Sequence, residues 1–163
     1  MTKNPQLQVA ILIGSEKDYE VMSEAKRVLD EFGVANEIMV ISAHRTPERC
    51  RQFARNARAR GIKVIIAGAG KAAHLAGVIA SYTTLPVIGV PLDASLGGLD
   101  ALLSTVQMPA GVPVATMAIG RSGAVNSALY AVAILALSNP DLEKKLERFR
   151  KKQSQPVKKM KKG

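Results

Sequence analysis

The sequence is poor in the residues that build disulfides and metal sites. It contains one cysteine and two histidines in 163 residues. A single cysteine cannot form a disulfide within the chain, and the spacing of the cysteine and histidines does not fit a metal site. Cys50 falls on the apolar side of an expected helix together with Phe53, Ala54 and Ala57. We therefore interpret it as a core residue rather than a nucleophile, and we expect no bound metal.

Long apolar segments and leader patterns are also missing. The longest apolar stretch, from Ala128 to Leu137, is too short and too interrupted to span a bilayer. The N-terminal residues lack the pattern of a signal peptide. These absences predict a cytoplasmic protein with no membrane partner.

Acidic residues are scarce at the C-terminal end. Between Lys144 and Gly163 ten lysines and arginines face one acid, Glu147, so this segment holds +9 of the formal net charge of +10. The rest of the chain carries only +1, which argues against a specific nucleic-acid partner, although a basic tail could touch polyanions. We predict that residues 154–163 form a disordered tail. Residues 1–153 have the length and apolar content of one domain with one core.

Short strand-like runs alternate with segments of helical period. Between the first two runs, apolar residues recur at spacings of three and four from Tyr19 to Phe32, and Gly33 follows as a helix stop. This alternation predicts an α/β fold: a three-layer αβα sandwich with a flavodoxin-like parallel sheet of about five strands. The candidate strands are Gln8–Ile13, Glu37–Ile41, Lys63–Ala67, Pro86–Val90 and Pro113–Met117.

Other helices are predicted from their end signals. Thr46 is expected to cap a helix with Pro47 at its first position, and this helix should stop at Gly61. The connection from Pro91 to Gly111 is long, rich in glycine and poor in strand signals, so we predict a functional loop there. Further helices are expected after Gly70, after Gly123, and from Asn139 onward.

Polar segments follow three of the predicted strands, where ligands bind in an open parallel sheet. They read GSEKD (14–18), SAHR (42–45) and GAGKAAH (68–74). In the first segment, Ser15 and Asp18 fit a capping box at a helix start. The same helix start would also attract an anion, and the sequence leaves both interpretations open.

The third segment resembles two nucleotide-binding motifs without matching either well. It fails as a phosphate loop, because Ile65 and Ala72 stand where a glycine and a hydroxyl are required. It fits only the permissive GxGxxA form of the dinucleotide fingerprint, with Asp93 as the ribose-binding acid. We prefer the interpretation that Gly68 and Gly70 let a ligand approach the backbone closely.

His44 is ambiguous by itself, because a lone histidine beside a helix start is often only a polar surface residue. Its neighbour Arg45 offers an anion clamp, and Ser15, Asp18 and His74 follow other strands that reach the same sheet edge. The sequence has no paired-carboxylate site and no nucleophile elbow. The combination points to acid–base chemistry by His44 on a phosphorylated small molecule.

Four co-linear motifs carry a family resemblance: GSEKD, SAHRTP, VIIAGAGKAAHLAG, and LPVIGVP with STVQMPAGVPVAT. Together they resemble the class I N5-carboxyaminoimidazole ribonucleotide mutases of purine biosynthesis, over about residues 8–150. The related class II enzymes carboxylate aminoimidazole ribonucleotide directly with CO2. Those enzymes usually carry a lysine where this chain has Arg45.

The resemblance implies a cofactor-free isomerisation that moves a carboxylate from an exocyclic nitrogen to carbon 4 of the imidazole. In this scheme His44 is the general acid/base: it protonates the nitrogen as CO2 leaves, the ring recaptures CO2, and His44 then removes the proton from carbon 4. Ser15 and Arg45 would bind the 5′-phosphate and Asp18 the ribose. His74 would lie near the carboxylate, and the base pocket would be lined by Ser42, Ala43, Gly70 and Leu75.

The family also implies a homo-octamer with sites at subunit boundaries. Three positions depart from the family pattern: Lys17 replaces a usual second serine, Lys71 stands where glycine is common, and Ala76 replaces a usual proline. These departures affect the expected loop shape and affinity more than the reaction. Two alternatives stay open, namely direct carboxylation by CO2 and a non-catalytic nucleotide-binding or RNA-associated module.

Overall fold

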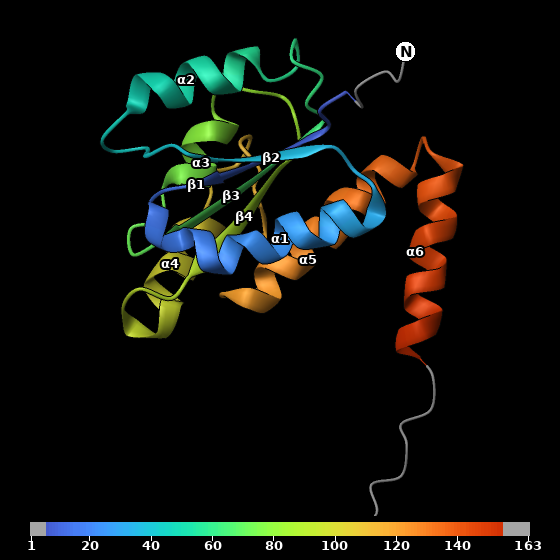
Figure 1. Cartoon of the computed structure of the whole chain (residues 1–163). Coiled ribbons are helices and arrows are strands. Elements are labelled where there is room, and N and C mark those ends of the chain that lie inside the picture. Colours follow the sequence, from blue (N-terminus) through green and yellow to red (C-terminus); the bar gives the residue numbers. More distant parts are fainter. Residues whose placement is uncertain (1–5, 155–163) are drawn as a thin grey trace, which may run out of the picture.

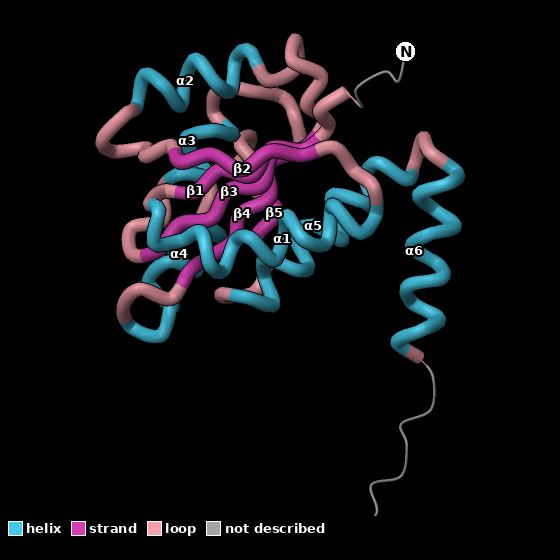
Figure 2. The backbone as a smooth tube through the Cα atoms, viewed as in Figure 1, coloured by secondary structure: helices cyan, strands magenta, loops and turns pink. Residues whose placement is uncertain are grey.

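The computed structural model describes residues 6–154 and folds them around a parallel sheet (Figure 1, Figure 2). The strand order is β2-β1-β3-β4-β5, and every neighbouring pair is parallel. The five predicted strands are confirmed, with ends that differ by up to three residues. Their bounds are Val9–Ile13 for β1, Asn36–Val40 for β2, Val64–Gly70 for β3, Val87–Leu92 for β4 and Ala115–Thr116 for β5.

Helices cover both faces of this sheet, as the three-layer prediction requires (Figure 1). Alternate residues of β1 point to opposite faces: Ile11 belongs to the core under α1 and α5, and Leu12 to the core under α2 and α3. Both residues are fully buried. The helix bounds are Tyr19–Phe32 for α1, Pro47–Asn56 for α2, Leu75–Ala80 for α3 and Arg121–Ala136 for α5.

The first crossover helix is the one predicted from its apolar spacing. Met22, Ala25 and Leu29 of α1 are fully buried, and Gly33 ends the helix in the left-handed conformation with a φ of 73°. On the other face, Cys50 of α2 is fully buried, as predicted. Burial also raises the pKa of its thiol, which keeps the nucleophilic thiolate scarce.

The last helix, α6 (Pro140–Gln153), begins where the sequence predicts. The Asn139 side chain accepts hydrogen bonds from the N–H groups of Asp141 and Leu142, at 3.1 and 3.3 Å. The helix is attached to the end of α1, where Lys145 donates to the Phe32 carbonyl at 2.8 Å. The predicted tail, residues 154–163, lies outside the described residues apart from Ser154.

The predicted loop from Pro91 to Gly111 is wrong in part, because it contains a helix. Strand β4 continues to Leu92, a single 3-10 turn follows at Leu96–Gly98, and α4 spans Leu99–Val106. The helix has only eight residues and follows Gly97 and Gly98 directly, so turn signals dominate the local sequence. It packs against β4, where Gly89 leaves room for the Thr105 side chain.

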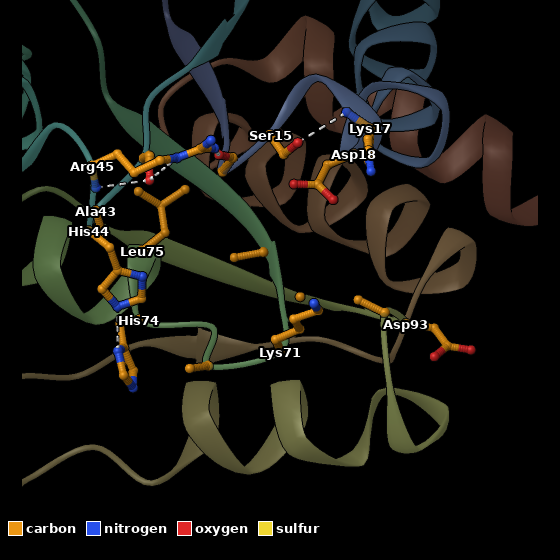
Figure 3. Close-up of a pocket in the computed structure, with 16 residues that line it drawn as sticks. Ser15, Lys17, Asp18, Ala43, His44, Arg45, Lys71, His74, Leu75 and Asp93 are labelled. Carbon is orange, nitrogen blue, oxygen red and sulfur yellow. Dashed lines mark hydrogen bonds between the residues drawn. The ribbon is translucent and has the colours of Figure 1, made fainter.

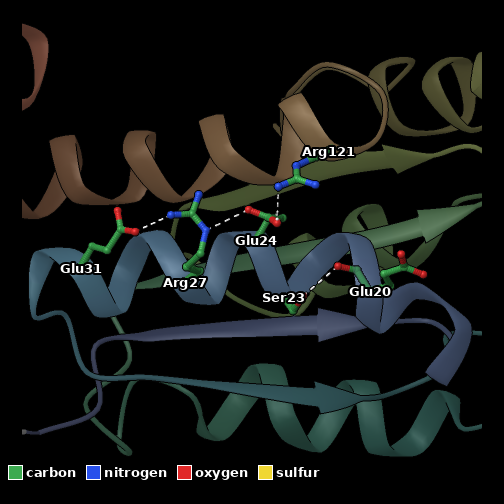
Figure 4. A network of polar contacts seen from close by, with 6 residues as sticks. All are labelled: Glu20, Ser23, Glu24, Arg27, Glu31 and Arg121. Carbon is green, nitrogen blue, oxygen red and sulfur yellow. Dashed lines mark hydrogen bonds and ion pairs between the residues drawn. The ribbon is translucent and has the colours of Figure 1, made fainter. Parts of the chain in front are cut away.

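Helix α5 begins at Arg121, and the predicted start after Gly123 is therefore wrong. Gly123 lies in the first turn, where an added Cβ would come within 1.7 Å of the Ala118 carbonyl oxygen. That glycine is needed for close packing rather than for a helix start. Arg121 crosses to α1 and pairs with Glu24 at 2.7 Å, within a row of charges that joins the two helices (Figure 4). Among the helices of residues 6–154, none has the length and apolar character needed to cross a membrane.

Candidate functional site

A cavity of about 810 Å³ lies at the carboxyl ends of β1, β2, β3 and β4 (Figure 3). It is where the strand-end argument places a ligand. All nine residues that the sequence nominates line it, together with seven others. The nominated residues are Ser15, Asp18, Ser42, Ala43, His44, Arg45, Gly70, His74 and Leu75; the others are Gly14, Lys17, Ala69, Lys71, Ala72, Asp93 and Ala94.

The segment after β1 presents a hydroxyl and a carboxylate to the cavity. The Ser15 hydroxyl accepts a hydrogen bond from the Lys17 N–H at 3.3 Å, and the Asp18 N–H donates to the Ser15 carbonyl at 3.0 Å. Burial raises the pKa of the Asp18 carboxyl, and a hydrogen bond from the Ser15 backbone opposes this rise. The Ser15 hydroxyl therefore caps this turn through the Lys17 N–H and also lies at the cavity, so capping and ligand binding are compatible for Ser15.

The segment after β2 ties Arg45 to two strand ends. Its backbone N–H and its Nε donate to the Ser42 hydroxyl at 3.2 and 3.4 Å, and its Nη2 donates to the Gly14 carbonyl at 3.3 Å. The guanidinium is thus oriented before any ligand arrives, which suits an anion clamp. Thr46 does not cap α2 with its side chain, contrary to the prediction. Its hydroxyl instead donates to the Ser42 carbonyl at 2.9 Å and closes the turn.

The two histidines of the chain meet in the cavity. His44 Nε2 lies 2.8 Å from His74 Nδ1, and the rings are nearly perpendicular, with an interplanar angle of 81° (Figure 3). At this distance one ring donates a proton and the other accepts it, so the contact holds a single proton between the rings. The sequence nominated both histidines, but it did not predict this contact.

The segment after β3 is shaped by its glycines. An added Cβ on Gly70 would come within 2.8 Å of the Ala94 Cβ, and one on Gly68 within 2.6 Å of the Met22 sulfur. Gly68 therefore serves packing under α1 and does not line the cavity, which corrects its predicted role beside a ligand. Gly70 does line the cavity, and so does Leu75, the first residue of α3.

Sequence reasoning underestimated the contribution of the β4 end. Asp93 and Ala94 line the cavity, although Asp93 was considered only as part of a weak dinucleotide motif. The position of Asp93 directly after a buried strand was the sequence signal that could have identified it as a cavity residue. The cavity carries three basic side chains (Lys17, Arg45 and Lys71) against two carboxylates, which suits an anionic ligand. In the described part of the chain, no group of three or more His, Cys, Asp or Glu side chains is placed to hold a metal ion.

Comparison with known proteins identifies the family of the chain. A family model described as AIR carboxylase matches residues 8–156. Among curated proteins, the Pyrococcus horikoshii "N5-carboxyaminoimidazole ribonucleotide mutase" is 55% identical over 156 residues, covering 95% of this chain and 87% of that protein. The Brucella melitensis protein of the same name is 53% identical, covering 93% and 94%. The crystal structure of Treponema denticola PurE matches with a TM-score of 0.81 at 25% identity, covering 90% of this chain and 91% of that one.

Proposed function

The chain belongs to the AIR carboxylase family, and from this membership we propose that it is an N5-carboxyaminoimidazole ribonucleotide mutase, an isomerase of purine biosynthesis. The observation that carries the proposal is the cavity itself. Four strand ends bring a histidine pair, a tethered guanidinium, the Ser15 hydroxyl and the Asp18 carboxylate into one space. Relatives that are 51–57% identical over most of the chain have the mutase name.

The reaction moves a carboxylate within one nucleotide. The substrate is a carbamate on the exocyclic amine of aminoimidazole ribonucleotide, and the product has the carboxylate on carbon 4 of the ring. His44 donates a proton to the carbamate nitrogen as the N–C bond breaks and CO2 leaves. Carbon 4 then attacks the CO2 that the cavity retains, and neutral His44 removes the proton from carbon 4. Atoms and charge balance without a cofactor, and retention of CO2 makes recapture nearly intramolecular.

The histidine contact supports this role. His44 must both give and take one proton within a turnover, and the 2.8 Å contact with His74 gives it a proton-sharing partner inside the cavity. The partner lies on the loop after β3, while His44 follows β2, so the contact also fixes the two loops relative to each other. His74 thereby holds His44 in position near the migrating carboxylate.

The remaining nominated residues hold the nucleotide. Arg45 and the Ser15 hydroxyl bind the 5′-phosphate, and Asp18 accepts hydrogen bonds from the ribose hydroxyls. The base lies against Leu75 and Gly70. The carboxylate lies near His74, along the turn that begins at Ser42 and Ala43.

We also propose the wider setting that the family suggests. The active unit is a homo-octamer in the cytoplasm, built from one mutase domain over residues 1–153. The basic residues beyond this domain take no part in catalysis. No specific nucleic acid and no membrane partner is needed for this function.

Direct assay separates the proposal from its two rivals. The purified chain is given the freshly prepared carbamate substrate, and formation of 4-carboxyaminoimidazole ribonucleotide is followed over time. We expect rapid turnover with the carbamate and much slower turnover with aminoimidazole ribonucleotide plus CO2. Activity with the second pair alone would identify a direct carboxylase. A folded protein that binds nucleotide without turning over either substrate would be a binding module.

A further inference from the structure

A second cavity, of about 440 Å³, lies between the C-terminal end of α2 and the segment that joins α3 to β4. We call it the groove. Ala54, Arg55 and Arg58 line one wall, and residues 81–84 line the other. Because all five strands are parallel, a segment that leads into β4 lies at the amino ends of the strands. The groove is therefore at the edge of the sheet opposite to the first cavity and shares no residue with it.

The arginines of this chain are concentrated beside the groove. Five of its ten arginines fall between residues 49 and 60, and this segment contains no acidic residue. Two of the five, Arg51 and Arg60, pair with glutamates at 2.8 Å each. In the described part of the chain, Arg55 and Arg58 form no ion pair, and no carboxylate lines the groove. The groove therefore holds two guanidinium charges without an acidic partner.

Both guanidinium groups are held toward the opposite wall. Arg58 Nη2 donates to the Thr84 hydroxyl at 3.0 Å, and the guanidinium carbon of Arg55 lies 5.8 Å from the centre of the Tyr82 ring. A guanidinium has five N–H donors, so these contacts leave most of them for a ligand. The planar arrangement of these donors suits phosphate oxygens, and a guanidinium is only weakly hydrated.

The opposite wall adds neutral donors. The backbone N–H groups of Thr83 and Thr84 donate to no acceptor among residues 6–154, whereas the next N–H, from Leu85, donates to the Thr83 hydroxyl at 3.2 Å. The C-terminal ends of α2 and α3 also lie here and contribute a partial negative charge of about one half each. They offset only part of the two arginine charges, so the groove keeps a positive charge.

We propose that the groove binds the phosphate group of a small molecule. Arg55 and Arg58 hold phosphate oxygens from one wall, and the donors of Thr83 and Thr84 complete the site from the other. A phosphate group offers at least three acceptor oxygens, enough for two guanidinium groups and a backbone donor, whereas a carboxylate offers two. The inference goes beyond the mutase function, since a ligand in the groove does not compete for space with a nucleotide in the first cavity.

NMR titration of the full chain, labelled at its threonine methyl groups, tests the proposal. The probes are inorganic phosphate and adenosine monophosphate. Thr83 and Thr84 report on the groove, and Thr46, which is bonded to Ser42 in the turn beside the first cavity, reports on that cavity. We expect both probes to shift the Thr83 and Thr84 signals to saturation, with a Kd on the order of 1 mM. Equal affinity for the two probes would show recognition of the phosphate alone, and tighter binding of adenosine monophosphate would add a base contact; both results support the proposal.

Substitution of the two arginines tests which groups bind the probe. We expect Arg55→Gln and Arg58→Gln each to weaken the titration at Thr83 and Thr84 by about 10-fold and to leave the titration at Thr46 unchanged. The Arg55 side chain is exposed, so Arg55→Gln still tests the site if Arg58→Gln disturbs the fold. The matched control is Arg49→Gln, which removes the same charge from the same segment but outside the groove, and it should bind like the wild type.

Three results would overturn the proposal. They are the absence of a saturable shift at Thr83 and Thr84 in the wild type, an equal loss of affinity in Arg49→Gln, and the same shift with sodium chloride at equal ionic strength. The last two would show a general effect of charge rather than a site. None of the three bears on turnover of the carbamate substrate, so the mutase proposal is tested separately.

Discussion

His44 is the residue whose chemistry the proposed reaction needs most. We expect His44→Asn to lower kcat by roughly 100-fold or more, since asparagine keeps a polar side chain but cannot carry a proton near neutral pH. Steady-state turnover of the carbamate substrate measures this loss. The control is nucleotide binding by the same variant, which should stay within about three-fold of the wild type because no phosphate contact is removed.

His74 provides a second measurement on the same contact. His74→Asn keeps a polar group opposite His44 but removes the shared proton between two rings. We expect its pH–rate profile to shift, as a change in the environment of His44 requires.

Near-normal turnover in His44→Asn would show that the proton is carried elsewhere, and the family-derived mechanism would then be wrong for this chain.

Asp18 illustrates a residue whose burial has a cost in stability. Burial raises the pKa of its carboxyl above that of the unfolded chain. Such a group binds protons more tightly in the folded state, so the free energy of unfolding falls as the pH rises from the ordinary carboxyl pKa through the raised one. Above that window the ionised carboxylate destabilises the fold. In the proposed function, this cost is offset by the use of Asp18 as a charged acceptor for the ribose hydroxyls.

We therefore expect Asp18→Asn to raise the melting temperature at neutral pH by about 1–3 °C and to weaken nucleotide binding. The asparagine oxygen can still accept the hydrogen bond from the Ser15 backbone. Thermal melts at neutral and acidic pH measure the effect, and the two proteins should converge once Asp18 is protonated. A lower melting temperature for Asp18→Asn at neutral pH would contradict the argument from burial.

The sequence was a good guide to which residues line the cavity. It was a poor guide to how these residues contact one another. The strand-end rule needs only the order of apolar runs, and it brought Ser15, His44 and His74 to one edge. The 2.8 Å histidine contact and the left-handed φ of Lys71 depend on the shape of the loop after β3. That shape follows from tertiary packing of Gly70 on Ala94, which no local pattern encodes.

At the level of elements, strong periodicity was informative and short segments were not. Helix α1 has a full apolar face and a glycine stop, and its predicted extent is confirmed. Helix α4 has eight residues and directly follows two glycines, so its turn signals outweighed its helical period. The start of α5 was misplaced for a related reason. Gly123 looks like a break in the sequence, whereas the structure uses it for a close approach between backbone segments.

Gly123 should therefore tolerate no side chain, although it lies within a helix. An added methyl group would lie 1.7 Å from the Ala118 carbonyl oxygen, a backbone atom that cannot move without shifting the start of α5. We expect Gly123→Ala to lower the free energy of unfolding by about 3 kcal/mol, measured by urea denaturation. The matched control is Gly77→Ala in α3. A Cβ added at Gly77 would lie 3.0 Å from the sulfur of the flexible Met108 side chain.

Gly77→Ala should change the free energy of unfolding by no more than about 1 kcal/mol, because helix propensity favours alanine and the Met108 side chain can adjust. If the two variants were equally stable, the start of α5 would have to differ from the one described. The ion pair between Arg121 and Glu24 also supports the described start of α5, since it joins the first turn of α5 to α1. A displaced α5 start would break that pair.

At the scale of the whole molecule, charge and apolar surface are unevenly distributed. The formal charge of +10 lies almost entirely in the last twenty residues, and the body is nearly neutral. The cavity holds three basic side chains all the same. The affinity for an anionic substrate therefore depends on local placement rather than on the overall field. We accordingly attribute nucleotide binding to the cavity and not to the C-terminal lysines.

The apolar surface of α4 gives the octamer proposal a physical basis. Leu99, Leu103 and Val106 of α4 are 53%, 48% and 48% exposed, and their spacing places them along one side of the helix. Leu96, in the turn before α4, is 79% exposed. Exposed apolar stripes of this kind mark surfaces that other chains cover. The occupant that the family suggests is a second copy of this chain.

We expect light scattering to give the mass of eight chains for the wild type and of smaller species for the double variant Leu99→Asp with Leu103→Asp. Two buried charges at a subunit contact cost several kcal/mol, more than a contact between copies can compensate. The control is Leu137→Asp, which is 89% exposed and follows the last residue of α5. Because α4 follows Asp93 and Ala94 of the cavity wall, the double variant should also lose activity as it dissociates. An octamer that survives both substitutions would place the subunit contact on another face of the molecule.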